Sequence, residues 1–145
     1  MGAVKIGVIS CSGEDCLGGT ISRLATKRLL DEIRPGDGVT LCLPLFIAGG
    51  EEERGFAVAH PTITVDGCDK YCAKRATERL SGKVSDVVQV ADIIGSETAE
   101  GPILSTRNIS PEQQEMVDKV AEEIRVKFDR IAESYKGKAL PIMGI

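Results

Sequence analysis

The sequence predicts a small three-layer α/β fold of the Rossmann-like type, with a mostly parallel sheet of about four strands between two layers of helices. Short runs rich in Val and Ile alternate along the chain with longer segments of helical periodicity. The 145 residues are 42% hydrophobic, which is enough to bury one ordinary core. A single domain spanning residues 1–145 is therefore expected.

The N-terminal part of the chain predicts two strands and one helix. Residues 3–9 form a nearly continuous apolar run, as expected for a strand that is buried on both faces. After a loop rich in small residues, apolar positions repeat with helical spacing over 20–33. The turn signals at 35–38 end this helix, and a second strand follows over 39–43. The apolar stripe of the helix consists of Ile21, Leu24, Ala25, Leu29 and Ile33.

The middle of the chain predicts two further strands around one helix. The charged run at 51–54 indicates either a short helix or a loop. Residues 62–65 predict the third strand, and the Asp-Gly pair at 66–67 marks a turn. A helix is expected to begin at residue 68 or 69 and to end near residue 80. The segment 84–94, mostly Val and Ile on one side, predicts the fourth strand.

One long helix dominates the C-terminal part. Residues 95–109 have the composition of a loop. The sequence Ser-Pro-Glu-Gln at 110–113 places Ser at the helix cap, Pro at the first helical position and Gln three residues after the Ser. The helix is expected to reach about residue 136, and the tail 138–145 either adds an edge strand or lies over the surface. Its buried stripe consists of Val117, Val120, Ile124, Phe128, Ile131 and Tyr135.

Composition and charge argue against several classes of function. The net charge is −4 and no basic tail or long basic run is present, so nucleic acid is not an expected partner. No apolar run approaches about 18 residues, so no membrane span is predicted. The five cysteines follow no recognisable secretory signal, which argues against a disulfide framework and favours reduced thiols in the cytoplasm. A protein partner and the oligomeric state, including a homo-oligomer, stay open.

Four of the five cysteines fall where predicted strands end. Cys11 ends the first apolar run, Cys42 ends the second strand, Cys68 follows the third, and Cys72 comes four residues later. Because the carboxyl ends of parallel strands line one crevice, we expect these thiols to converge. Four thiolates around one ion is the tetrahedral arrangement that zinc favours in closed sites. The sequence therefore predicts a metal site with zinc as the ion; an Fe–S cluster is less favoured because its usual tight cysteine spacings are absent.

Cys68 and Cys72 form the sharpest local signal. If a helix begins at Cys68, the two thiols lie on one face of it, and the helix N-terminus stabilises thiolates. The alternative is that Cys72 is a small core residue beside Ala73 and Ala76. Cys16 is the surplus thiol, and it is either a fifth ligand candidate, a resolving partner for another cysteine, or a free side chain.

Three other features have both a functional and a structural interpretation. Gly18 and Gly19 either admit an anion to a helix N-terminus or make a flexible loop. Asp66 either accepts hydrogen bonds from backbone amides in its own turn or orients a ligand of the metal. His60, the single histidine, is expected on the surface or in a loop at the opposite end of the sheet from the cysteines.

Two functions besides metal binding stay open from the residues alone. In a thiol redox or sulfur-transfer enzyme, Cys68 at the helix start would be the nucleophile, and Cys72 or Cys11 would resolve it. In a binding module the cysteines would be bystanders. The sequence does not decide between an enzyme and a protein without catalytic activity, nor whether a zinc ion would be structural, carried or catalytic.

Three motifs resemble those of the DGC-domain proteins, which are named for an Asp-Gly-Cys motif. They are CSG at 11–13, CLPLFIAGG at 42–50 and DGCDKYCAKR at 66–75. The resemblance extends from the first strand through the segment 84–94, which is most of the chain. It implies a zinc site, but no particular reaction. An ion held entirely by thiolates at the edge of the sheet is expected to serve metal or sulfur handling. The metal ligands that the resemblance implies are Cys11, Cys42, Cys68 and Cys72, with Asp66 and Gly67 completing the named motif.

Overall fold

A four-stranded, all-parallel sheet forms the centre of the protein, as the sequence predicted. The computed structural model describes residues 4–103, 105 and 107–136. The strands are β1 (Ile6–Ser10), β2 (Gly38–Val39), β3 (Thr62–Asp66) and β4 (Asp86–Gln89), in the order β2-β1-β3-β4. The chain adds β2 on one side of β1 and β3 on the other. The carboxyl ends of β1 and β3 therefore flank the point where the strand order reverses, which is where open α/β sheets bind ligands.

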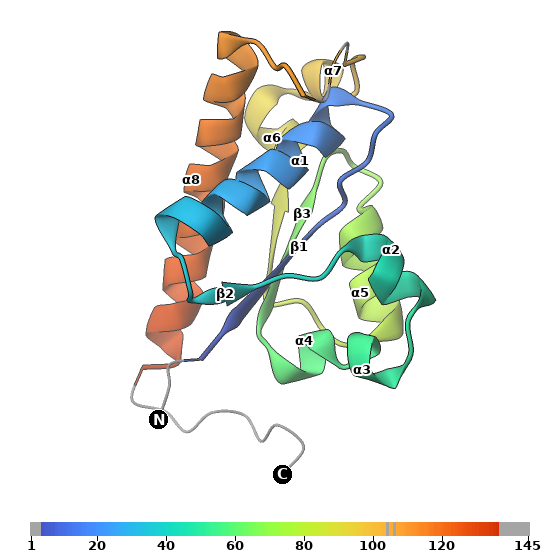
Figure 1. Cartoon of the computed structure of the whole chain (residues 1–145), viewed down its shortest axis with the longest axis vertical. Coiled ribbons are helices and arrows are strands. Elements are labelled where there is room, and N and C mark those ends of the chain that lie inside the picture. The colour runs from blue at the N-terminus through green and yellow to red at the C-terminus, as the bar shows by residue number, and fades with distance from the viewer. Residues whose placement is uncertain (1–3, 104, 106, 137–145) are drawn as a thin grey trace.

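Helices cover both faces of this sheet, which gives the three layers expected (Figure 1). Helices α1 and α8 lie against each other on one face, whereas α2, α3, α4 and α5 lie on the other. The short helices α6 and α7 lie near the carboxyl ends of the strands, at the top of Figure 1. The helical elements are α1 (Leu17–Arg28), the π-helical turn η1 (Leu29–Ile33), α2 (Leu43–Ala48), α3 (Glu51–Arg54), α4 (Phe56–Ala59), α5 (Cys72–Leu80), α6 (Val90–Ile94), α7 (Ser96–Ala99) and α8 (Pro111–Ser134).

Strand β1 is buried on both faces, as its apolar run predicted. Successive residues of a strand point to opposite faces of the sheet. Ile6 and Val8 pack in the core beneath α1 and α8, whereas Ile9 packs with Phe46 and Ala73 on the other face. The three strand residues are at most 1% exposed. The first strand is therefore the shared centre of two apolar cores.

The start of α8 confirms the capping signal in the sequence. Ser110 Oγ accepts a hydrogen bond from Gln113 N at 3.1 Å, and Gln113 Oε1 accepts one from Ser110 N at 3.0 Å. This reciprocal pair satisfies two amides that the helix itself leaves without partners. The predicted stripe faces the core beneath α8 and its members are buried, except for the partly buried Tyr135 just beyond the helix.

Two predicted strands are wrong in extent. The second was expected over 39–43, but β2 ends at Val39. Thr40 Oγ1 donates to Val8 O at 2.7 Å, so a side chain takes over from the backbone where the ladder stops. Leu43 already begins α2, with a proline in its first turn, where that residue is well tolerated.

The fourth strand was expected over 84–94, but β4 ends at Gln89 and the remainder forms α6. A short apolar run fits a buried strand or a buried helix equally well, which explains the error. Gly95 ends α6 with φ of 94°, and α7 then occupies part of the predicted loop. The charged run at 51–54 is helical, as α3. The tail at 138–145 lies outside the described residues.

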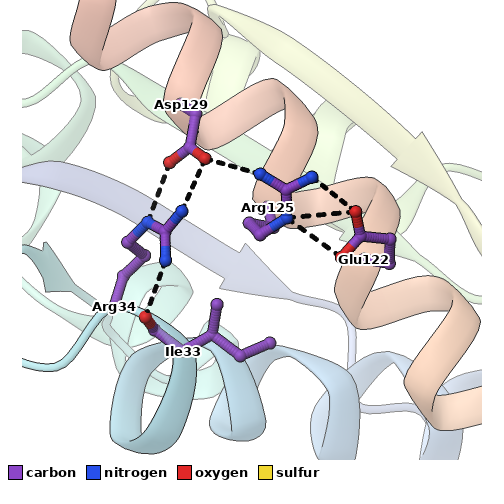
Figure 2. A network of polar contacts seen from close by, with 5 residues as sticks. All are labelled: Ile33, Arg34, Glu122, Arg125 and Asp129. Atoms are coloured by element: carbon purple, nitrogen blue, oxygen red, sulfur yellow. Dashed lines mark hydrogen bonds and ion pairs between the residues drawn. The ribbon is translucent and has the colours of Figure 1, made fainter.

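An ion-pair network joins the end of η1 to α8 (Figure 2). Arg34 donates to both oxygens of Asp129, at 2.9 Å through Nε and 2.7 Å through Nη2. Arg125 donates to the same carboxylate at 2.7 Å and also pairs with Glu122. The bond from Arg34 is the main cause that lowers the pKa of Asp129. This two-pronged geometry makes the link more specific than a single surface ion pair.

We predict that Asp129→Asn lowers the free energy of unfolding by about 1 kcal/mol at pH 7, because solvent and salt screen a carboxylate that is 35% exposed. The folded-state pKa is lowered, so the contribution is present above the unfolded-state pKa and is lost as the pH falls through the folded-state pKa. Urea unfolding from neutral to acidic pH measures the loss of stability at pH 7 and its dependence on pH. Asp118→Asn, which breaks a single exposed pair with Arg28, is the control. A loss that persists unchanged in acid, or that equals the control's, would contradict the prediction.

Candidate functional site

The cysteines lie near the carboxyl edge of the sheet, but in different local structures. Cys11 directly follows β1, and Cys68 lies two residues beyond β3. Neighbouring residues of these two strands are paired, since Ser10 lies opposite Val65 in the ladder. Cys42 was predicted to end a strand, which is wrong: it lies three residues beyond β2 and caps α2.

The predicted placement of Cys68 and Cys72 on one helical face is also wrong. Helix α5 begins at Cys72, and the preceding Tyr71 has the left-handed conformation, with φ of 53° and ψ of 46°. A helix cannot continue through such a residue, so Cys68 lies in the loop before the helix. Tyr71 is held in place by a hydrogen bond from Gln89 Nε2 to its hydroxyl, at 2.5 Å, and by the ammonium of Lys74, 5.4 Å from the ring centroid.

Cys11, Cys68 and Cys72, called the edge thiols below, are close enough to influence one another. The pKa of Cys72 is raised, first by burial and then by the charges of Asp66, Cys11 and Cys68, whereas Arg75 lowers it. Three thiols and one carboxylate, from β1, β3 and α5, therefore share one electrostatic environment. Across the residues described, no three His, Cys, Asp or Glu side chains are already arranged as a ligand set for a metal ion.

Cys42 reaches the same region through its neighbours in sequence. One apolar cluster contains Leu43 and Ala73, and both Cys11 and Leu41 pack against it. Leu41 and Leu43 flank Cys42, and Ala73 directly follows Cys72. The segments that carry three of the four predicted ligands therefore meet around this single cluster, on the face of the sheet covered by α2 and α5.

The thiol of Cys11 is oriented by two polar contacts. Gly67 N donates to its Sγ at 3.3 Å, and Ser22 Oγ lies 3.5 Å from the same sulfur. Ser22 uses its only hydroxyl proton in a 2.7 Å bond to Gly19 O. The Cys11 thiol must therefore donate its own proton to Ser22 while it accepts the amide proton from the loop after β3. The contact from Gly67 ties the loop after β3 to the loop after β1, and the contact with Ser22 ties the latter loop to α1.

Gly67 lies where no other residue fits. A Cβ on Gly67 would lie 2.5 Å from Gly18 C and 2.5 Å from Gly19 N, far inside normal contact distance. A Cβ on Gly19 would in turn collide with the backbone of Gly13. These partners are backbone atoms, so no side chain can swing aside. The glycines at the start of α1 thus have a role that neither sequence interpretation gave them: they let three backbone segments touch directly behind the edge thiols.

Asp66 anchors α5 to the end of β3. Its side chain is buried, with 1% of the residue exposed, and it accepts hydrogen bonds from Ala73 N at 2.7 Å and Lys74 N at 3.1 Å. These are free amides in the first turn of α5, so the carboxylate acts as a cap supplied from another element. Burial raises the pKa of Asp66 in spite of both amides. The sequence predicted bonds to backbone amides, but in the turn at 66–67 rather than in the helix beyond it.

The remaining candidates take structural positions. Cys16 is half-buried at the N-cap of α1, where its side chain makes no capping hydrogen bond. His60 follows α4 and precedes β3, so it lies at the amino end of the sheet, as expected, with its ring 5.2 Å from that of Phe56.

Ser12, next to Cys11, has a backbone φ of 53°, which the sequence did not predict. Strained backbone of this kind tends to collect at functional sites.

We predict that Gly67→Ala lowers the free energy of unfolding by roughly 1–3 kcal/mol, because the added methyl group must push two backbone segments apart. Urea unfolding gives the value. Gly13→Ala is the matched control: it lies in the loop that carries Cys11, and a Cβ there meets nothing within 4 Å. If the two variants are equally stable, the close packing of these backbones is not what requires a glycine at position 67.

Comparison with known proteins agrees with the motifs described above. No curated protein and no solved structure gave a significant match. A family model for the DGC domain matches residues 7–124, which includes all of the sheet except Ile6, the edge thiols and most of α8. The chain therefore belongs to the DGC domain family.

Proposed function

We propose that this protein binds a thiophilic metal ion, zinc in the first instance, through Cys11, Cys68 and Cys72, with Cys42 as the fourth ligand. The observation that carries the proposal is geometric: cysteine-bearing segments from distant parts of the sequence meet at one edge of the sheet. Thiolate sulfur is the donor that zinc takes in closed tetrahedral sites. The chemistry of the donor set therefore fits such an ion.

The electrostatics of the edge thiols support the same proposal. Removing protons from Cys11, Cys68 and Cys72 would gather several negative charges beside the buried Asp66. Burial is the first cause that raises the pKa of Cys72, and this repulsion is the second. A divalent cation would offset that repulsion. A bound zinc ion would supply this charge, and with four protein thiolates it would leave no open position for a substrate. Storage or transfer of the metal, or of sulfur, suits such a site better than catalysis at the ion.

The backbone around the site would hold the thiolates once their protons leave. Gly67 N already points at Cys11 Sγ, and an amide donor of this kind stabilises a thiolate more than a thiol. Asp66 fixes the first turn of α5, and Cys72 lies in that turn. These contacts are the kind of outer support that orients metal ligands in proteins.

The thiol redox or sulfur-transfer alternative has less support. It placed Cys68 at a helix N-terminus, but α5 begins four residues later. The alternative also offers Cys72 as a resolving thiol, and the raised pKa of Cys72 lowers the fraction of thiolate that this step needs. Within residues 4–103, 105 and 107–136, no helix is long and apolar enough to cross a bilayer.

The test is elemental analysis of the reduced protein, purified anaerobically without chelator, together with thiol titration of the same sample. We expect about one zinc per chain, with the ligand thiols shielded from the reagent. Serine variants of Cys11, Cys68 and Cys72 should each lose most of the metal. Cys16→Ser is the matched control and should keep it.

Two results would count against the metal site. The first is a protein that contains no metal and whose reactive thiols pair reversibly on mild oxidation. This result would favour redox or sulfur chemistry instead. Zinc that is bound equally well by the Cys16 variant and by all the edge-thiol variants would place the ion elsewhere in the chain.

A further inference from the structure

A cavity of about 260 Å³ lies beside the thiol site, on the β2 side of β1. The end of β1 and the loop after it, one face of α1, the start of η1 and the segment 40–42 line it, and Cys42 is part of its wall. Its volume is below the roughly 300–1,000 Å³ typical of pockets for drug-sized ligands, so a nucleotide or larger cofactor is too big for it. A small molecule of a few heavy atoms matches the space.

The cavity carries one positive charge that no described side chain neutralises. Arg23 and Lys27 line it from positions four apart on α1, which places both on the same helical face. Lys27 pairs with Asp31 at 2.9 Å. Arg23 forms neither a hydrogen bond nor an ion pair with another described side chain. Its guanidinium is thus available to a ligand with a single negative charge.

Hydroxyl groups line the same space. Ser10 Oγ and Ser12 Oγ are 2.8 Å apart, and whichever of them donates, the proton of the other is left over. Thr26 lines the cavity as well, and the residue is only 4% exposed. Its Oγ1 has no hydrogen-bond partner in the described part of the chain, but that atom is buried beneath the cavity surface and does not face a ligand there.

We propose that this cavity binds a small organic monocarboxylate next to Cys42. The carboxylate faces Arg23 and the proton left over from the Ser10–Ser12 pair, because planar guanidinium pairs well with carboxylate. A short apolar body lies against Leu30 and Leu41, which also line the cavity. The net charge of Arg23, Lys27 and Asp31 is +1, which suits a monoanion better than a phosphate of about −1.5 to −2. The site requires no metal ion and goes beyond the proposed metal binding.

The test is a titration of the reduced, metal-free full chain with butyrate, followed by amide chemical shifts. We expect saturable shifts at the amides of Thr40 and Leu41. Arg23→Gln should weaken the binding by about tenfold or more, since it removes a charge-assisted bond. Arg130→Gln is the matched control, because it makes the same change on an exposed part of α8. This variant should bind butyrate with the affinity of the wild type.

Three outcomes would overturn the carboxylate site: no saturable shift, equal weakening by both arginine variants, or tighter binding of inorganic phosphate than of butyrate. Because the titration contains no metal, its result is independent of the zinc measurement. A protein that binds butyrate but no zinc refutes the metal proposal alone, and one that binds zinc but no butyrate refutes this inference alone.

Discussion

The direct contact between the backbone of Gly67 and the first turn of α1 is the constraint on which the site depends. No side chain separates them, so the loop after β3 comes close enough for Gly67 N to donate to Cys11 Sγ at 3.3 Å. The neighbouring Asp66 reaches the other way and caps α5, which begins with Cys72. In the Asp-Gly-Cys motif, Asp66 thus positions the helix that begins with Cys72. Gly67 allows the backbone of α1 to approach, and Cys68 supplies a further thiol.

The same arrangement works against the stability of the fold. A carboxylate that is 1% exposed is costly to bury, and its pKa is raised accordingly. Tyr71 and Ser12 both have left-handed backbone, which costs an L-residue roughly 1–2 kcal/mol. Three unfavourable features next to the edge thiols are unusual for a region that serves packing alone. They are expected where a protein holds groups in place for chemistry, and the ion pairs of Asp129 with Arg34 and Arg125 strengthen the fold elsewhere.

The architecture was predictable because its signals are local. Neighbouring residues in the sequence are enough to indicate a strand buried on both faces or the cap at Ser110. The order of strands and helices along the chain indicated a parallel sheet. The errors at β2 and α5 depend on tertiary contacts. Thr40 ends β2 by bonding across to β1, and the left-handed Tyr71 delays α5, neither of which any periodicity reveals. That Cys11 and Cys68 lie at the same edge followed from the parallel order of β1 and β3, whereas the reason for Gly67 required the position of α1.

The central claim is that thiols from separate segments act together on one metal ion. X-ray absorption at the zinc edge of the metal-loaded protein tests it most directly, because it reports the atoms bound to the ion. The claim predicts a shell of sulfur atoms at about 2.3 Å, lost in part when an edge thiol is replaced by serine. A shell made only of nitrogen or oxygen at about 2.0–2.2 Å would contradict it, since the ion would then be held by other residues.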